Sequence, residues 1–376
     1  MHGGRGHPGG VGSGVRPARL ADSRDDALTR VLRMVAPGTA LREGLENILR
    51  ARTGALIVVG DSPQVLELVD GGFHVDTELN PSALYELAKM DGAIVLSSDA
   101  QRILYANAQL NPDPMIPTFE TGTRHRAAER MAKQTGELVI SISQRRNMVT
   151  LYKGDIKYVL RDLNVIISKA NQALSTLERY RSVLEQSLVN LSALEFEDLA
   201  TLLDVATVLQ RAQMVERIAS EIRRYVVELG TEGRLVEMQL EELLSEIEDE
   251  GALVFRDYWV PQDGRHPDEV WAELCRRTAQ DEIPDVNVIL KAMGHGQVAS
   301  LETAVVPRGY RILHKIPRLP MPVIENLVKK FQRLPNILSA SIDQLDDVEG
   351  IGEVRAKAIK EGLHRLREQV LLDRHL

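Results

Sequence analysis

The first 155 residues alternate between short apolar runs and segments with helical spacing. Runs with the length and β-branched content of strands stand at 55–60, 92–98, 137–144 and 148–155. Apolar residues three and four apart predict two short helices within 24–53, broken at Pro37-Gly38, and further helices at 81–90 and 124–136. Residues 100–110 fit either a helix or an extended segment. The alternation predicts an α/β domain with a mixed sheet at its centre.

The middle of the chain has a different pattern, because neither glycine nor proline occurs between Asp155 and Leu229. Apolar residues recur there at spacings of three and four: Val159, Leu163, Ile166, Ala170, Leu174, Leu177, Tyr180 and Leu184. Such a stripe predicts a helix with one face against a partner. Similar patterns follow at 191–230 and 235–250, so we expect a helical bundle over 156–305, with its charges on the solvated face.

A glycine-containing turn stands near the end of the chain, in "LDDVEGIGEVRAKAI" (345–359). Gly350 and Gly352 flank Ile351, and without Cβ atoms they allow a tight turn and a close approach to a phosphate. The turn N–H groups and the start of the next helix would point at that anion, with Arg355 and Lys357 adding charge. The alternative is an ordinary helical turn with incidental glycines.

A weaker copy of this pattern lies 32 residues earlier. The apolar residues Leu313, Ile316, Leu319, Ile324 and Leu327 correspond to Leu345, Val348, Ile351, Ala356 and Ile359. Arg318 and Pro320 replace the two glycines, and proline offers no N–H. Residues 307–336 carry seven cations, Lys315 among them, against Glu325 alone, which gives +6. An excess of this size is typical of a surface that binds a polyanion.

Composition narrows the class of protein. The chain has 376 residues, 44% hydrophobic and 27% charged, with a net charge of −8, so contact with nucleic acid requires a local basic patch. The single cysteine, Cys275, excludes an internal disulfide framework and fits a reducing cytosol. No apolar run approaches the roughly 20 residues that span a bilayer, so we expect no membrane contact and a cytoplasmic location. Residues 1–22 are predicted to be a disordered, mildly basic tail.

The clearest polar signal in the first domain is "TGTRHRAAER" (121–130). Thr123 is a candidate N-cap, and Arg124 and Arg126 stand where the helix dipole disfavours cations. A ligand with several negative charges would resolve that conflict through the helix N–H groups and both guanidinium groups. Asp91, just before an apolar strand, could bring Mg²⁺ or Mn²⁺ to the same phosphates. The alternatives are a turn at Asp91-Gly92 and a solvated helix end.

Three stretches carry a resemblance to a known family: "MDGAIVLSSD", "QLNPDPMIPTFETGTRHRAAERMAKQTG" and "VISISQRRN". They resemble the diadenylate cyclase domain. The order of parts resembles that of the bacterial DNA-integrity scanning proteins, and the similarity covers nearly the whole chain after the tail. The resemblance implies a multidomain α/β plus α fold, with a mixed-sheet cyclase domain at 23–155, a helical spine at 156–305 and a helix–hairpin–helix domain at 306–376.

The family converts two ATP molecules into cyclic di-AMP and two pyrophosphates, in an octamer of two tetramers that meet through their cyclase domains. By resemblance, Asp91 would ligate the metal and orient the attacking hydroxyl, and Gly92 and Leu110 would contact adenine. The triphosphate would be held by Thr123, Arg124, His125 and Arg126, with a further contact from Ser143. The family commonly has threonine after this motif, whereas Ala127 stands here and removes one hydroxyl donor. A general base is not evident, with Asp91 and His125 as candidates.

The resemblance further implies that the hairpins bind branched double-stranded DNA such as Holliday junctions, with a nucleoid-associated location, and that DNA binding restrains cyclase activity. An alternative is a non-catalytic adaptor that binds branched DNA and keeps a nucleotide pocket. A nuclease or ligase is disfavoured, because the chain has no lysine-nucleophile motif, no acidic cluster suited to two metals and no Cys/His zinc spacing.

Overall fold

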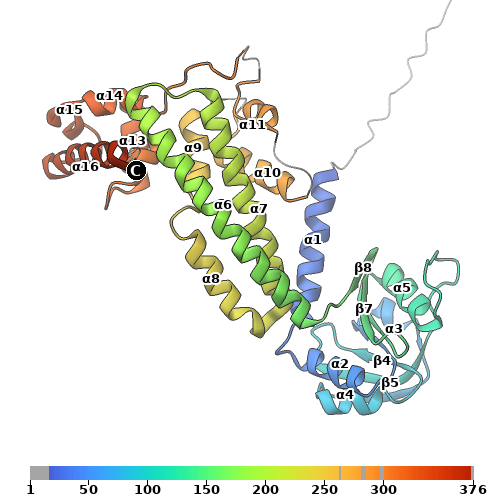
Figure 1. Cartoon of the computed structure of the whole chain (residues 1–376). Helices are drawn as coiled ribbons and strands as arrows, with labels where there is room; N and C mark the ends of the chain where they lie inside the picture. Colours follow the sequence, from blue (N-terminus) through green and yellow to red (C-terminus); the bar gives the residue numbers. More distant parts are fainter. Residues whose placement is uncertain (1–16, 262–263, 281–284, 297–299, 374–376) are drawn as a thin grey trace, which may run out of the picture. The chain divides into compact units, whose positions relative to one another are not determined.

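The computed structural model describes residues 17–261, 264–280, 285–296 and 300–373, which form two compact units (Figure 1). The first comprises the described residues up to Ser168 together with Arg224–Arg234, and the second comprises Lys169–Arg223 and the described residues from Leu235 onward. Among the described residues, no helix combines the length and the apolar content that a membrane crossing requires.

The first unit contains a mixed sheet, as predicted. Its strands are β1 (Ala55–Val59), β2 (Val69–Asp70), β3 (Phe73–Glu78), β4 (Ala93–Leu96), β5 (Arg102–Leu110), β6 (Leu138–Ser143), β7 (Met148–Lys153) and β8 (Ile156–Val159). They lie in the order β2-β5-β4-β1-β6-β7-β8, with β3 paired to β5. β1 runs parallel to β4, and every other pairing is antiparallel. The segment 100–110 is therefore extended rather than helical.

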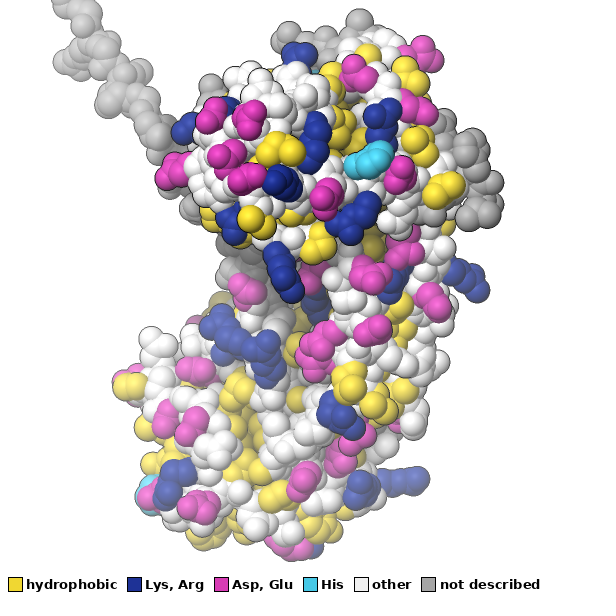
Figure 2. All heavy atoms as spheres, turned by 90° about the vertical axis from the view of Figure 1, so that its left-hand side faces the viewer, with side chains coloured by type: hydrophobic (Ala, Val, Ile, Leu, Met, Phe, Trp, Pro, Cys, Tyr) yellow, Lys and Arg dark blue, Asp and Glu magenta, His cyan; other side chains and the backbone are white. Residues whose placement is uncertain are grey.

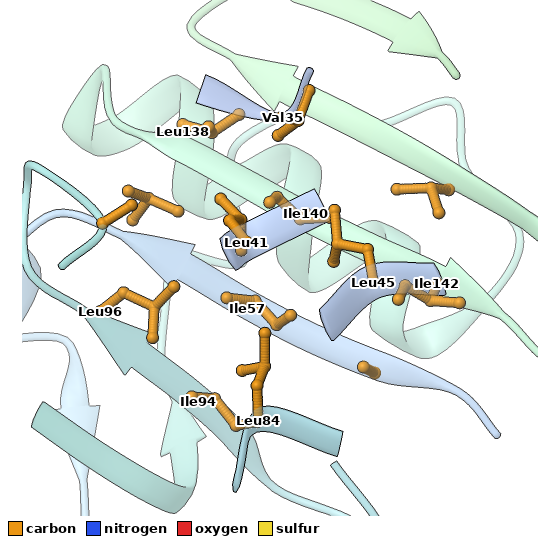
Figure 3. Close-up of a cluster of buried hydrophobic side chains, with 14 of the residues drawn as sticks. Val35, Leu41, Leu45, Ile57, Leu84, Ile94, Leu96, Leu138, Ile140 and Ile142 are labelled. Atoms are coloured by element: carbon orange, nitrogen blue, oxygen red, sulfur yellow. The ribbon is translucent and has the colours of Figure 1, made fainter. Parts of the chain in front are cut away.

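Helices cover both faces of this sheet. They are α1 (Pro17–Met34), α2 (Ala40–Arg50), α3 (Pro63–Leu66), α4 (Pro81–Leu87) and α5 (Thr123–Thr135). Because side chains alternate along a strand, Ile57 of β1 packs under α2 and α4, whereas Val58 packs under α5. Figure 3 shows Ile57 on the central strand β1, with Leu41, Leu45 and Leu84 of the covering helices around it. The central strands are buried on both faces, which fixes their pairing register. The positions of the loops at their ends follow from that register.

The second unit consists of helices. They include the long helices α6 (Leu163–Glu197) and α7 (Leu202–Leu229), which contribute residues to both units, and a 3₁₀ turn at Gly230–Gly233. The others are α8 (Arg234–Leu244), α9 (Glu250–Tyr258), α10 (Pro267–Gln280), α11 (Val286–Ala292), α12 (Tyr310–His314), α13 (Met321–Phe331), α14 (Leu334–Ser339), α15 (Ile342–Asp346) and α16 (Glu353–Asp373). The predicted helical bundle is confirmed.

Several boundaries differ from those expected. α1 begins at Pro17, inside the predicted tail, because proline suits a first helical turn and no glycine or proline follows until Pro37. Residues 1–16 lie outside the described residues. β8 extends the sheet beyond residue 155, because the turn at Gly154 lets the chain fold back on β7. Helical and hairpin segments on either side of residue 305 share one unit, through a buried ionic network at Arg311.

That network corrects the sequence reading of one cation. Arg311 counts toward the basic excess of 307–336, yet its side chain is fully buried. It forms ion pairs with Glu195 and, at 3.7 Å, with Glu250. Asp257 accepts hydrogen bonds from the backbone N–H groups at the start of α12. Arg311 therefore fixes α12 to α6 and α9, and it contributes nothing to a DNA-binding surface.

The predicted 32-residue repeat is confirmed. We call Tyr310–Phe331 the first hairpin and Ile342–Asp373 the second hairpin. α12 and α15 start and end 32 residues apart, and so do the starts of α13 and α16. Arg318 and Gly350 occupy equivalent turns and both have positive φ, +61° and +84°. Their apolar residues form one shared core, so the two hairpins fold as a pair.

Candidate functional site

The residues singled out in the first domain come together at one edge of the sheet. Gly92 precedes β4, Gly54 precedes the parallel strand β1, and these two strand starts lie side by side. Leu110 and Ser143 end the antiparallel neighbours β5 and β6, so they lie at the same edge. The start of α5 lies there as well, since the guanidinium of Arg124 lies against Gly54. Strand order and direction therefore assemble the site.

Two opposite charges meet at this edge. The Arg124 guanidinium donates to Oδ1 of Asp91 across 3.2 Å. The Asp91 carboxylate is fully exposed, at 103% of its reference area, and Arg124 is partly exposed at 36%. An exposed ion pair of this kind contributes at most about 1 kcal/mol to stability. Both groups can therefore exchange this contact for a ligand at little cost.

Gly92 follows Asp91 and is required by close packing. A Cβ there would lie 2.4 Å from the carbonyl carbon of Asn107. Asn107 itself has a positive φ of +54°, at an irregularity between β4 and β5. Its side chain accepts the Gly92 N–H at 3.1 Å. The two residues thus hold the backbone after Asp91 in place, and the Gly92 N–H is already used within the chain.

The helix α5 begins one residue earlier than the capping pattern suggests. Gly122, rather than Thr123, is the N-cap, and no side chain caps the helix. The first helical hydrogen bond runs from the Arg126 N–H to the Gly122 carbonyl. Glycine needs no side-chain bond to turn the chain into a helix, so the first N–H groups of α5 remain available to an anion. Arg126 is exposed and, among the described residues, has no ion-pair partner.

Beneath these cations lies a set of polar contacts that sequence reasoning missed. The His125 Nδ1 atom and the hydroxyl of Ser141, a buried residue of β6, are 2.7 Å apart. The His125 ring also meets Tyr152 edge-on, with ring centroids 6.4 Å apart. Burial lowers the pKa of His125 below its ordinary value, against the opposing effect of Glu120. His125 is therefore a neutral, oriented imidazole at neutral pH.

Glu120 anchors the loop that leads into α5. Its carboxylate accepts a 2.9 Å hydrogen bond from the Tyr152 hydroxyl and pairs with Lys157 of β8. Burial opposes the charge on Glu120, but these two partners hold its pKa below the ordinary value. Burial and the bond to Glu120 raise the pKa of Tyr152 well above its usual range. Only the sheet pairing of β7 with β8 brings these groups together, so the local sequence could not predict their contacts.

The remaining predicted residues have supporting positions. Leu110 is partly buried against the sheet face that α5 covers, and Ala127 packs there too. The Ser143 hydroxyl accepts the Arg146 N–H at 3.2 Å and so shapes the turn between β6 and β7. Cys275 is free, and burial raises its pKa to about 12, which fits a packing role. No group of three or more His, Cys, Asp or Glu side chains suited to a metal occurs among the described residues.

The two hairpin turns form a second candidate site, in the second unit. A groove of about 530 Å³ is lined by residues of both turns: Ile316, Pro317, Arg318 and Leu319 from the first, and Gly352, Glu353, Val354 and Arg355 from the second, with Ala358 and Ile359. Arg355 donates to the Gly350 carbonyl, and Lys357 pairs with Glu353 at 2.6 Å. Lys315 pairs with Glu250 at 3.4 Å. Figure 2 shows Lys and Arg mixed with Asp and Glu over the hairpin helices, rather than a continuous basic face.

Comparisons with known proteins match the sheet domain and the helical region that follows it. The family model described as DisA bacterial checkpoint controller nucleotide-binding matches residues 42–156, and the DisA bacterial checkpoint controller linker region matches residues 160–302. The DNA integrity scanning protein DisA of Symbiobacterium thermophilum is 60% identical over 92% of this chain and 98% of its own length. The protein of the same name from Carboxydothermus hydrogenoformans is 58% identical over the same shares.

Among solved structures, the crystal structure of DacA from Staphylococcus aureus matches 37% of this chain and 90% of its own chain. The sequence identity is 18% and the TM-score is 0.28.

Proposed function

The chain belongs to the family of DisA bacterial checkpoint controllers and is a nucleotidyltransferase of the diadenylate cyclase class, and we propose that it condenses two ATP molecules into cyclic di-AMP and two pyrophosphates. We further propose that the two hairpins bind branched double-stranded DNA and that this binding lowers cyclase output. The alternative is a non-catalytic adaptor that binds branched DNA and retains a nucleotide pocket.

The observation that carries the enzymatic proposal is the meeting of Asp91 and Arg124 at the uncapped start of α5. A polyphosphate has the charge to satisfy Arg124, Arg126 and the free N–H groups of the helix at once. Thr123 adds a hydroxyl at the first helical position. The His125 ring, oriented by its contact with the Ser141 hydroxyl, lies at the same start of α5.

A divalent ion, Mg²⁺ or Mn²⁺, fits the residues at this edge. Mg²⁺ commonly uses one or two protein carboxylates and takes its other ligands from substrate phosphates and water. Asp91 is an exposed carboxylate of this kind, and the lack of a larger acidic cluster among the described residues suits an ion that arrives with the nucleotide. Such an ion would neutralise charge on the phosphates and favour ionisation of the attacking hydroxyl.

The chemistry requires alignment more than covalent participation by the protein. A 3′-hydroxyl of one ATP attacks the α-phosphorus of the other, the bond from that phosphorus to the pyrophosphate oxygen breaks, and pyrophosphate leaves with the electron pair. A second attack, with the two nucleotides exchanged, closes the ring and releases the second pyrophosphate, and the proton of each attacking hydroxyl passes to water. Arg124, Arg126 and the N–H groups of α5 hold the phosphates in line and offset their charge. Asp91 orients the hydroxyl, and we assign no separate general base.

A symmetric product needs two copies of this site facing each other, because one set of residues binds one ATP. We therefore propose that the cyclase domains of two chains pair across their nucleotide sites, within the homo-octamer implied by the family. Gly92 and Leu110 lie beside Asp91 at the same sheet edge, where an adenine attached to the bound triphosphate could reach them. Ser143 lies at the same sheet edge, where its hydroxyl accepts the Arg146 N–H in the turn between β6 and β7.

The DNA proposal is supported by the turn geometry of the hairpins. Gly350 has the left-handed conformation of a tight turn, and the N–H groups of Gly350 and Gly352 have no backbone acceptor among the described residues. Such donors can bind a backbone phosphate whatever the base sequence. Arg318 brings a cation to the equivalent place in the first hairpin. The exposed pairing of Lys357 with Glu353 is weak enough to open for a phosphate.

Incubation of the purified protein with ATP and Mg²⁺ or Mn²⁺ tests the enzymatic proposal. We expect cyclic di-AMP and pyrophosphate in a 1:2 ratio, resolved by chromatography and mass spectrometry. Binding of ATP without any cyclic product, under either metal, would favour the adaptor.

A Holliday-junction analogue tests the coupling. We expect it to bind more tightly than a linear duplex of equal length and to lower the rate of product formation. An unchanged rate at saturating junction would refute inhibition by DNA while leaving the cyclase assignment intact.

A further inference from the structure

Gly54, a residue outside the sequence-predicted site, lies directly under Arg124. It is buried just before β1. A Cβ placed on Gly54 would lie 2.1 Å from Nη1 of Arg124 and 3.2 Å from its central guanidinium carbon. Non-bonded heavy atoms ordinarily stay about 3.5 Å apart or more. The guanidinium therefore occupies space that any side chain at position 54 would fill.

Backbone conformation does not explain the glycine. Gly54 is not among the residues with positive φ, so alanine could adopt its backbone angles without strain. The other contact of the added Cβ, with the Ile142 carbonyl oxygen at 3.2 Å, needs a shift of only a few tenths of an ångström. The one severe conflict is with the tip of Arg124, which is flexible and can move at small cost to folding.

We propose that Gly54 is a positioning residue for the cyclase reaction, which acts by leaving room for Arg124 to lie at the start of β1 and reach Asp91. This inference rests on the proposed function. The 3.2 Å contact between Arg124 and Asp91 places the guanidinium beside the carboxylate that orients the hydroxyl. From that place Arg124 can exchange Asp91 for a phosphate without a large movement.

A side chain at position 54 would displace the guanidinium by roughly 1 Å or more, because the 2.1 Å approach must grow to an ordinary contact. A displacement of about 1 Å within a reacting site can lower the rate on the order of 100-fold. The cost should fall on alignment in the transition state more than on the affinity for ATP, since Arg126 and the N–H groups of α5 stay in place. Hence kcat should fall more than KM rises.

The first test compares Gly54→Ala with Gly60→Ala. Gly60 follows the other end of β1, its φ is also outside the positive range, and its added Cβ would meet the flexible side chain of Glu137 at 2.8 Å. The two changes are thus matched in kind and differ in place. We expect Gly54→Ala to lower kcat by about 10- to 100-fold, while Gly60→Ala stays within about twofold of the parent and both variants have similar Tm values.

The second test is a double-mutant cycle with Arg124→Ala. If Gly54 acts only through the guanidinium, Gly54→Ala should have no further effect on kcat when Arg124 is absent. Equal losses from Gly54→Ala in both backgrounds would overturn the inference, as would parental activity of Gly54→Ala or of Arg124→Ala. A Tm of Gly54→Ala far below that of Gly60→Ala would assign the residue to folding instead.

The inference and the proposed function can fail separately. If the parent protein forms no cyclic dinucleotide, the proposed function fails. The same four proteins are then compared for their affinity for ATP with Mg²⁺ by calorimetry. A small loss of affinity in Gly54→Ala that vanishes in the Arg124→Ala background would still support the positioning of Arg124, and either no loss or additive losses would overturn it.

Discussion

The molecule has two cation-bearing candidate sites, and they are built in opposite ways. At the sheet edge, Arg124 comes from α5, its partner Asp91 precedes β4, and the space for its guanidinium is left by Gly54 before β1. In the second hairpin, Arg355 bonds to Gly350 and Lys357 to Glu353, five and four residues away. Long-range assembly gives the first site a defined geometry around one reacting group. Local assembly gives the second an exposed set of charges, which suits contact with a repetitive phosphate backbone.

Removal of the Asp91 charge should have the largest effect. We expect Asp91→Asn to lower cyclic di-AMP synthesis by at least about 100-fold, because it removes the carboxylate that we propose orients the hydroxyl. Binding to a Holliday-junction analogue should be unchanged. Asp61→Asn is the control, since Asp61 is an exposed aspartate beyond the opposite end of β1 that bonds to Ser98. Activity of Asp91→Asn close to that of Asp61→Asn would contradict the role of Asp91.

The buried cation Arg311 differs from both sites and should affect stability most. Arg311→Ala leaves the buried carboxylate of Glu195 without its ionic partner, and we expect a loss of about 3–5 kcal/mol in the free energy of unfolding. Lys315→Ala removes an exposed partner of Glu250 and should cost less than about 1 kcal/mol. Chemical denaturation of the whole chain, followed by circular dichroism, measures both. Equal, small losses would remove the structural role of Arg311.

A glycine gained in the first hairpin turn and a glycine lost from the second should change Tm in opposite directions. Arg318 holds a left-handed conformation that costs a non-glycine residue roughly 1 kcal/mol or more. Arg318→Gly should therefore raise Tm by a few degrees, while DNA affinity falls several-fold and its salt dependence weakens by about one phosphate. Gly350→Ala should lower Tm, because its φ is +84° and its Cβ would meet Val323 at 3.2 Å. Unchanged DNA affinity in Arg318→Gly would assign the strained turn to folding alone.

The smallest expected effect is on pH dependence. Burial lowers the pKa of His125, so the unfolded chain takes up a proton at this residue before the folded chain does. Stability from this group is present at neutral pH and falls as pH decreases through about 6.5, the unfolded value. His125→Gln should show a smaller loss of Tm between pH 7.5 and pH 5.5 than the parent. An identical acid dependence in both proteins would show that His125 does not contribute.

Much of the fold follows from the sequence pattern. The strands at the sheet centre are apolar on both faces, and the stripe along α6 buries Ile166, Ala170 and Leu177 as the spacing predicts. Two members of the predicted stripe are wrong, because Val159 lies in β8 and Tyr180 is exposed. The repeat of the hairpins was equally legible, because the apolar positions of a hairpin depend on local geometry. The first hairpin keeps its turn although Arg318 replaces glycine there, since Arg318 adopts the left-handed conformation of Gly350.

The residues that support the candidate site, Ser141 and Glu120, could not be predicted from the sequence in the same way. Ser141 looks like any small residue on a strand, and Glu120 like any loop carboxylate. Each gains its partner only when β6, β7 and β8 pair and α5 covers them. The burial of Arg311 could not be predicted from the local sequence either. Its sequence neighbours are cationic, yet its environment is set by α6 and α9, far away in the chain.

Sequence pattern alone predicts most strands and helices, the paired hairpins and the residues Asp91 and Arg124, because these depend on local spacing, turn chemistry and motif. The packing of the folded chain sets which charges meet, which are buried and which glycine leaves space for a neighbour. The physical reason is that local preferences act through neighbours along the chain, whereas the dielectric environment and the contacts of a side chain are set by elements that meet only when the sheet and the helices pack together.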